Sequence, residues 1–316
     1  MKKILVIGFG AMGCRHVQSL LGHKDQYDIH VVEPSGQIVE MNTERIGAKP
    51  GDFTRHEKLD AVPDGVDLAI VATSSGPRYQ IVKQLLENNV RLFLLEKIVF
   101  QSEQQFHDII QLLEKHNAKA YCNFVNRYFG AYNQIKQAIE TSRAACTMVV
   151  HGGEFGLGCN AIHYIDIFQY LNGSNELTMN GSLLSALEIE NRRGKEYREF
   201  TGLMNIADKA GNKLTLIAEK DFSGGVTIDI QFGNSRYILS EQTQKMFSIE
   251  EKDAVVAAFT IVPTSRLTHT IAQDIFSGNC RLTQVAETAQ AHSLLFNSFN
   301  KIIYTTTDQQ TLCPIT

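Results

Sequence analysis

The sequence lacks the features that mark several classes of protein. Its 316 residues contain no basic tract, and a net charge of −4 with a pI near 6.2 argues against binding to a nucleic-acid backbone, which needs concentrated Lys and Arg. No apolar run approaches the ~20 residues that cross a bilayer. Repeats and low-complexity segments are also missing. We therefore expect neither a nucleic-acid partner nor membrane insertion.

Paired cysteine motifs are missing as well. The six cysteines are scattered without a CxxC pair, at Cys14, Cys122, Cys146, Cys159, Cys280 and Cys313. The first residues, MKKILVIGFG, run directly into a strand pattern and do not resemble a cleavable signal peptide. We expect a protein of the reducing cytoplasm.

The chain shows two different sequence patterns, one in its first part and one in its second. Its content of 43% apolar residues is enough for two hydrophobic cores. In the first part, continuous apolar runs alternate with amphipathic helical patterns, the runs lying at 4–8, 29–33, 68–73, 91–96 and 118–124. Such runs between helices indicate a parallel sheet covered on both faces. We predict an α/β protein whose first domain is a doubly wound domain over residues 1–122.

The second pattern consists of β segments in which apolar and polar residues alternate, joined by turns such as Ala210-Gly211-Asn212 and Ser223-Gly224-Gly225. It predicts a C-terminal α/β domain over residues 123–316 with a large, mostly antiparallel open sheet. Helical patterns close the chain near 268–277 and 283–304. We expect the C-terminal helix to pack back toward the first domain.

A dinucleotide fingerprint follows the first strand. The motif G-x-G-x-x-G is formed by Gly8, Phe9, Gly10, Ala11, Met12 and Gly13, directly after a strand and at the start of a helix. Gly8 permits the turn, Gly10 lets the backbone approach a pyrophosphate, and Gly13 lets the helix pack on the strand. We predict a Rossmann domain whose helix N-terminus binds the pyrophosphate.

An acidic residue ends the second predicted strand. Glu33 stands twenty residues after Gly13, where a carboxylate accepts hydrogen bonds from the adenosine ribose and repels a 2′-phosphate. The following residues, Pro34-Ser35-Gly36-Gln37, contain no Arg, although Arg15 and Arg45 can fold back. The sequence favours NAD over NADP.

Several segments in this order resemble the glucose-fructose oxidoreductase, inositol dehydrogenase and rhizopine-catabolism family, Gfo/Idh/MocA. They are GFGAMGCRH, the Ala-Thr turn and helix at 68–88, LLEKI at 94–98, Ile162-His163-Tyr164-Ile165-Asp166, the segment 262–268 and the C-terminal helix. The resemblance implies a second domain that carries the substrate pocket and, commonly, the oligomer contact of a homodimer or homotetramer. It also implies hydride exchange between a nicotinamide and the hydroxyl or carbonyl carbon of a sugar or cyclitol.

The resemblance also implies the roles of individual residues. Lys97 takes the place of the family's catalytic lysine, and His163 is the candidate base, because hydride removal from a carbinol requires that the hydroxyl proton be taken. The expected cofactor contacts beyond the fingerprint and Glu33 are Thr73, Ser74, Ser75, Tyr79, Glu96 and Lys97. The expected substrate contacts are Asn123, Arg127, Asn160, Asp166, Arg193 and Lys195, where Asp166 can also orient His163.

Two departures from the family qualify this assignment. Many members carry an Asp four residues before the histidine, where this chain has Cys159, and a Pro after the lysine, where it has Ile98. Since a cis bond without proline costs about 2.5–4 kcal/mol, we predict a trans bond between Lys97 and Ile98. Cys159 and His163 have a metal-ligand spacing, but without converging ligands we expect no metal.

The sequence leaves three functions open. The first is an NAD-dependent oxidoreductase acting on a sugar or a derivative, including acidic, amino and nucleotide-linked sugars. The second is NAD-assisted elimination or cleavage of a glycosidic bond with transient oxidation of the sugar. The third is an NAD-responsive binding protein without turnover. Net formation of NADH with a sugar substrate distinguishes the first function from the other two.

Overall fold

The computed structural model describes residues 1–153, 155–186, 194–250, 253–304 and 312–316. The chain divides into two compact units, and each is described separately. The N-terminal unit comprises Met1–Phe100, Gln104–Val125 and Val262–Ala286. The C-terminal unit comprises Gln101–Glu103, Asn126–Ile261 and Glu287–Thr316.

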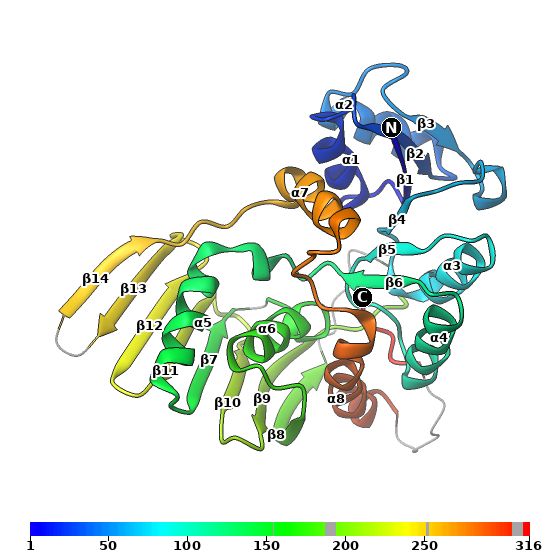
Figure 1. The fold of residues 1–316 in the computed structure, drawn as a ribbon. Helices are drawn as coiled ribbons and strands as arrows, with labels where there is room; N and C mark the ends of the chain where they lie inside the picture. Colours follow the sequence, from blue (N-terminus) through cyan, green and yellow to red (C-terminus); the bar gives the residue numbers. More distant parts are fainter. Residues whose placement is uncertain (154, 187–193, 251–252, 305–311) are drawn as a thin grey trace. The chain divides into compact units, whose positions relative to one another are not determined.

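The N-terminal unit is built on a six-stranded parallel sheet with the order β3-β2-β1-β4-β5-β6 (Figure 1). Its strands are β1 (Lys2–Ile7), β2 (Tyr27–Val32), β3 (Thr54–His56), β4 (Leu68–Val71), β5 (Leu92–Leu95) and β6 (Lys119–Cys122). All four residues of β4 are buried, as are four consecutive residues of β1, so both faces of the sheet are covered. The edge strand β3 was not predicted, because three half-exposed residues carry no apolar run.

The helices of this unit are α1 (Gly13–Leu21), α2 (Gly36–Ile46), α3 (Ser75–Glu87), α4 (Glu103–Lys115) and α7 (Thr264–Ser277), with the short helix η1 (Leu59–Ala61). Residue Glu103 of α4 is grouped with the other unit. Helix α7 lies far along the chain but packs against α1. After it, the carbonyl oxygen of Thr283 accepts a hydrogen bond of 2.8 Å from the backbone amide of Cys122, which extends the edge of β6.

The C-terminal unit contains an eight-stranded sheet with the order β14-β13-β12-β11-β7-β10-β9-β8 (Figure 1). Its strands are β7 (Cys146–Gly152), β8 (Leu177–Ala186), β9 (Phe200–Asp208), β10 (Lys213–Ala218), β11 (Thr227–Phe232), β12 (Ser235–Ser240), β13 (Lys245–Glu250) and β14 (Asp253–Ala258). Every neighbouring pair is antiparallel except β7 and β10. The predicted α/β fold, with a Rossmann sheet and a mostly antiparallel sheet, is therefore confirmed.

The described helices of the C-terminal unit are α5 (Gly130–Ser142), α6 (Leu157–Asn172), α8 (Val285–Ile303) and the short η2 (Val125–Tyr128). Val125, Val285 and Ala286 are grouped with the other unit. Helix α6 contacts α5 and strands β7, β9 and β10. The alternation of buried and less buried residues along β7 and β10 is typical of a sheet with one face on a core. Among the described helices, none has both the length and the apolar character needed to cross a membrane.

Candidate functional site

The glycine fingerprint forms an open cradle between β1 and α1. Gly8 has φ +86°, a conformation that favours glycine, and a Cβ on Gly13 would stand 1.8 Å from the carbonyl oxygen of Gly8. A Cβ on Gly10 would project into open space. Within the described residues, no side chain caps the N-terminus of α1. The cradle therefore fits a pyrophosphate, whose oxygens accept from backbone amides at such a helix end.

Glu33 lies at the carboxyl end of β2 and is held by the backbone around the cradle. Its carboxylate accepts hydrogen bonds from the amides of Phe9, at 3.0 Å, and Ser35, at 3.1 Å. A carboxylate has about four acceptor positions, so two donors leave capacity for ribose hydroxyls. Asn42 donates to the carbonyl oxygen of Phe9 at 2.7 Å and braces the same turn from α2.

One cation near this turn was not predicted. Arg55, from β3, donates from Nε to the carbonyl oxygen of Glu33, at 3.2 Å, and from Nη2 to that of Pro34, at 3.0 Å. Its guanidinium therefore lies on the segment that follows Glu33. Arg55 is 22 residues away in sequence, and only the pairing of β2 with β3 brings it here.

The turn after β5 presents Lys97. Lys97 is partly exposed, whereas its neighbours Glu96, Ile98, Val99 and Phe100 are buried. The Lys97–Ile98 peptide bond is cis, so the prediction of a trans bond was wrong. The cause lies in the tertiary contacts of the turn, which the local preference for trans does not include.

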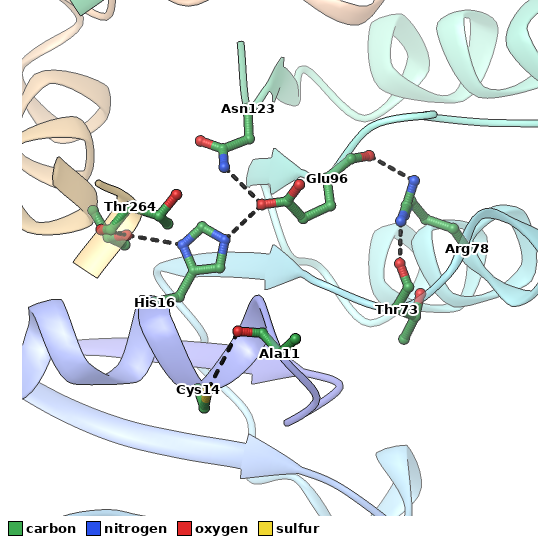
Figure 2. Close-up of polar contacts among 9 residues, drawn as sticks. Ala11, Cys14, His16, Thr73, Arg78, Glu96, Asn123 and Thr264 are labelled. Atoms are coloured by element: carbon green, nitrogen blue, oxygen red, sulfur yellow. Dashed lines mark hydrogen bonds and ion pairs between the residues drawn. The ribbon is translucent and has the colours of Figure 1, made fainter. Parts of the chain in front are cut away.

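Arg78 makes these contacts and occupies the core of the turn. The side chain of Arg78 is fully buried on α3, and it donates to the carbonyl oxygens of Glu96 and Thr73 (Figure 2). It also donates to the carbonyl oxygens of Ile98 and Val99. These four acceptors come from the ends of β4 and β5. A single buried guanidinium thus satisfies the backbone on both sides of Lys97.

The side chain of Glu96 belongs to a buried polar network (Figure 2). Its Oε1 accepts a hydrogen bond from Asn123 Nδ2, at 2.7 Å, and lies 3.0 Å from His16 Nε2. The other ring nitrogen of His16 lies 2.9 Å from the hydroxyl of Thr268 on α7. The network joins α1 and α7 to the residues that follow β5 and β6, and Glu96 directly precedes Lys97 in the sequence.

The network determines the charge of Glu96. Burial acts to raise the pKa of this carboxyl, but the hydrogen bond and charge of His16, the amide of Asn123 and the charge of Lys97 together lower the pKa to about 2. Glu96 is therefore an anion at neutral pH although it is 5% exposed. Such a buried anion is tolerated only where donors and a cation surround it.

His163 and Asn160 lie on α6 in the C-terminal unit. His163 is partly exposed, whereas Ala161, Ile162 and all residues from Tyr164 to Gln169 are buried. The side chain of Asn160 donates from Nδ2 to the carbonyl oxygen of Phe155. The backbone amide of Asn160 donates to the carbonyl oxygen of Gly156 at 2.8 Å. The helix begins at Leu157, between Gly156 and Gly158.

The carboxylate of Glu199 caps this helix from a distant part of the chain. Its Oε1 accepts from the amide of Gly158 at 2.5 Å, and a Cβ on Gly156 would stand 2.6 Å from its Oε2. Glycine at these positions therefore makes room for the carboxylate. A negative group at a helix N-terminus is favourable, so Glu199 stabilises the start of α6.

Arg127 and Asp166 form an ion pair within the C-terminal unit. Arg127 donates from Nε, at 2.9 Å, and from Nη2, at 2.8 Å, to the two oxygens of Asp166. The guanidinium also lies over the ring of Tyr170, 5.1 Å from its centroid. Both oxygens of Asp166 thus accept from Arg127, and this contact fixes Arg127 against α6.

Comparison with known proteins identifies the first domain. Residues 2–124 match the family model described as the oxidoreductase family with an NAD-binding Rossmann fold. The N-terminal domain is that of the Gfo/Idh/MocA oxidoreductase family. No curated protein matches the chain in sequence. The resemblance seen in the fingerprint and in LLEKI is therefore confirmed over this domain.

Solved structures of several oxidoreductases share the fold of nearly the whole chain. An oxidoreductase from Agrobacterium radiobacter, in complex with NAD+, L-tartaric acid and magnesium, has a TM-score of 0.74 at 13% identity, over 93% of this chain and 94% of that one. A 3-ketoreductase from Actinomadura kijaniata, in complex with NADP and TDP-benzene, has a TM-score of 0.73 at 12% identity, over 93% and 95%. A UDP-N-acetylglucosamine 3-dehydrogenase from Acidithiobacillus ferrooxidans has a TM-score of 0.72 at 11% identity, over 94% and 96%. At these identities the similarity establishes the fold.

The remaining predicted site residues of the Gfo/Idh/MocA domain lie near the ends of β4 and on α3. Thr73 and Ser74 are partly exposed and Ser75 is buried. The Thr73 hydroxyl has no hydrogen-bond partner among the described residues, which suits a polar ligand atom. Tyr79 donates its hydroxyl to Asp108 at 3.0 Å and packs edge-on against Phe100.

Of the two predicted substrate residues that precede β9 in the sequence, the structure describes one. Lys195 is exposed, and Arg193 falls outside the described residues. In the described part of the chain, no three His, Cys, Asp or Glu side chains converge as metal ligands.

Sequence reasoning missed the buried residues that support Lys97 in this Gfo/Idh/MocA domain. His16 follows Gly13 by three residues in the segment GFGAMGCRH, and Arg78 follows the Ala-Thr turn. Each is fully buried, which is unusual for these residue types. Their proximity to the fingerprint and the turn was visible in the sequence, but their partners, such as Glu96 and Thr268, lie 18 to 252 residues away.

Proposed function

We propose that the protein is an NAD-dependent oxidoreductase that transfers a hydride between the nicotinamide and a hydroxyl or carbonyl carbon of a sugar or sugar derivative. The observation that carries the proposal is the cradle at Gly10, open above the N-terminus of α1 and followed by Glu33 at the end of β2. Gly8, Gly10 and Gly13, with the amides of Ala11 and Met12, would hold the pyrophosphate. Glu33, which accepts from the amide of Phe9, would bind the adenosine ribose. Bound NAD would supply the hydride acceptor.

Lys97 and His163 are the proposed catalytic residues. Lys97 is the partly exposed residue of a buried turn at the carboxyl end of β5, where ligands of open parallel sheets bind. Its ammonium would stabilise negative charge on the substrate oxygen. His163, the partly exposed residue of a buried stretch of α6, would take the hydroxyl proton as the base.

A sugar-like substrate is proposed from the neighbours and from the polar groups near these residues. The similar structures include a UDP-N-acetylglucosamine 3-dehydrogenase and a 3-ketoreductase. Asn160, Arg127, Lys195 and Arg193 are the proposed contacts of such a substrate. Asp166 and Asn123 act on it through Arg127 and Glu96, to which they are hydrogen-bonded. We further propose a cytoplasmic homodimer or homotetramer.

NAD is the proposed cofactor in preference to NADP. The carboxylate of Glu33 would repel a 2′-phosphate, and its position is fixed by two amides. The positive charge of Arg55 would favour the 2′-phosphate of NADP, because its guanidinium lies on the turn after Glu33. Arg55→Ala should therefore weaken NADP binding more than NAD binding.

The decisive experiment is a screen for NADH formation with hydroxy-sugars, acetamido sugars and sugar acids. With a substrate that reacts, Lys97→Ala should bind NADH like the wild type while turnover falls about 10²–10⁴-fold. Because the chain has no Trp, NADH emission reports binding without a Trp background. Unchanged turnover in Lys97→Ala contradicts the assignment. Cleavage of a sugar bond without net NADH supports the elimination reaction instead, and NADH binding without any turnover supports a binding protein.

A further inference from the structure

We propose that His16 is a positioning residue for Lys97, and that the buried ion pair of His16 with Glu96 holds the turn of Lys97 in register with the phosphate cradle. The proposal rests on the proposed function for the catalytic role of Lys97. The placement of the turn follows from the contacts within the N-terminal unit alone (Figure 2).

The hydrogen bonds around His16 hold both nitrogens of its ring. The hydroxyl of Thr268 donates to the carbonyl oxygen of Thr264, at 3.0 Å, and lies 2.9 Å from His16 Nδ1. Nε2 faces the carboxylate of Glu96, which only accepts. Nε2 of His16 therefore donates to Glu96, and both ring nitrogens have a fixed, buried partner.

The ion pair fixes the residue that precedes Lys97. Oε1 of Glu96 binds the side chains of His16 and Asn123. The backbone amide of Glu96 donates to the carbonyl oxygen of Val71 at 3.1 Å, and the backbone carbonyl oxygen of Glu96 accepts from Arg78. The side chain and both backbone polar groups of Glu96 are thus bonded. The next residue, Lys97, starts from a backbone position that these bonds determine.

The same pair connects Lys97 to the cradle. His16 lies three residues after Gly13 on α1, the helix whose N-terminus faces the phosphate site, and Glu96 lies one residue before Lys97. Through Thr268, the ring is also anchored to α7. The contact between these two buried groups therefore fixes the turn of Lys97 relative to α1.

A purely stabilising role does not account for this arrangement. Burying an ion pair contributes little net stability compared with apolar residues of similar volume, because desolvation opposes the attraction. Directed hydrogen bonds between fixed partners instead specify geometry. Geometry is what a lysine that acts on a substrate oxygen requires.

The test compares His16→Gln, Glu96→Gln and the double variant with a control, His23→Gln. His23 stacks on His269 of α7, at 3.4 Å between ring centroids, so the control perturbs a contact of α7 with the residues just after α1 but does not touch Glu96. We expect kcat of His16→Gln to fall about 100-fold with unchanged affinity for NADH, as for a misplaced catalytic group. The kcat of the double variant should be about tenfold higher than that of His16→Gln, because the effects of changing two residues in contact are not additive.

The proposal is overturned if kcat of His16→Gln falls no further than kcat of the His23 control. It is also overturned if weaker NADH binding or unfolded protein explains the loss of kcat. Amide hydrogen exchange of peptides that cover residues 94–101 provides a readout without a substrate. Exchange should accelerate in His16→Gln and not in His23→Gln. If the wild type turns over no sugar, the proposed function fails, whereas the exchange result still decides whether His16 holds the turn.

Discussion

Arg127 binds both carboxylate oxygens of Asp166, with hydrogen bonds of 2.9 and 2.8 Å, and the Asp166 side chain is 1% exposed. The pair joins η2 to the middle of α6, so the residues that follow the Rossmann domain are fixed to the helix that carries His163. A bidentate contact of this kind restrains the direction of the guanidinium as well as its distance.

Asp166→Ala should therefore lower the free energy of unfolding by about 3 kcal/mol, since removal of one partner leaves a largely buried charge. Replacing both partners by apolar residues, in Arg127→Met with Asp166→Leu, should cost less than the single change. Tyr170→Phe is the control, because it keeps the ring beneath Arg127. Urea unfolding followed by circular dichroism measures all of them, and a double variant as unstable as Asp166→Ala would contradict the explanation.

The fingerprint glycines should separate binding from folding. Gly10→Ala places a methyl group in open space, so stability should stay within about 0.5 kcal/mol of the wild type, while NADH binding weakens about tenfold or more. Gly13→Ala places its methyl group against the carbonyl oxygen of Gly8 and should lower stability by about 1–3 kcal/mol. Thermal unfolding and NADH fluorescence measure the two effects. Wild-type affinity in Gly10→Ala would show that no phosphate lies above Gly10.

Acid should weaken the N-terminal unit through Glu96. Its pKa of about 2 lies below the ordinary value of 4.5, so the ionised carboxylate stabilises the folded state above pH 4.5, and this contribution is lost as the pH falls toward 2. At 1.36 kcal/mol per pKa unit, the contribution is about 3 kcal/mol. The free energy of unfolding should fall more steeply between pH 5 and pH 2 in the wild type than in Glu96→Gln. Parallel curves would exclude a role for Glu96 in this acid sensitivity.

Glu241 should weaken the C-terminal unit as the pH rises, which is the opposite of the pH dependence expected from Glu96. Burial raises the pKa of its carboxyl, and the hydroxyl of Tyr164, which donates to Oε1 at 3.1 Å, lowers it only in part. A raised pKa means that the protonated form stabilises the folded state, and that this stability is lost as the pH rises through the folded-state pKa. Glu241→Gln should gain stability over the wild type from pH 4 to pH 7. Equal pH dependence of both proteins in thermal unfolding would refute this.

The sequence was most informative where local pattern and chemistry agree. Continuous apolar runs at 4–8 and 68–73 predicted buried parallel strands, and the fingerprint predicted the helix N-terminus that begins at Gly13. Local pattern carries no information on which unit a helix joins, as α7 shows.

The turn of Lys97 shows why the candidate site was only partly predictable. The position of Lys97 at a strand end followed from topology, but the trans bond predicted for Ile98 rested on the local cost of a cis peptide. The contacts of Arg78 and His16 that surround the turn come from α3 and α1. Interactions between residues so far apart in sequence have no signature in a single sequence.

The return of residues 262–286 to the N-terminal unit has a consequence for protein synthesis. Thr268 and Thr283, which bond to His16 and to Cys122, leave the ribosome after the whole sheet of the C-terminal unit has been made. The Rossmann domain therefore cannot complete its structure during translation until the second domain has emerged. A gene fragment that ends at residue 125 would encode a domain whose α1 surface stays uncovered, so a usable fragment must supply the 262–286 segment through a linker.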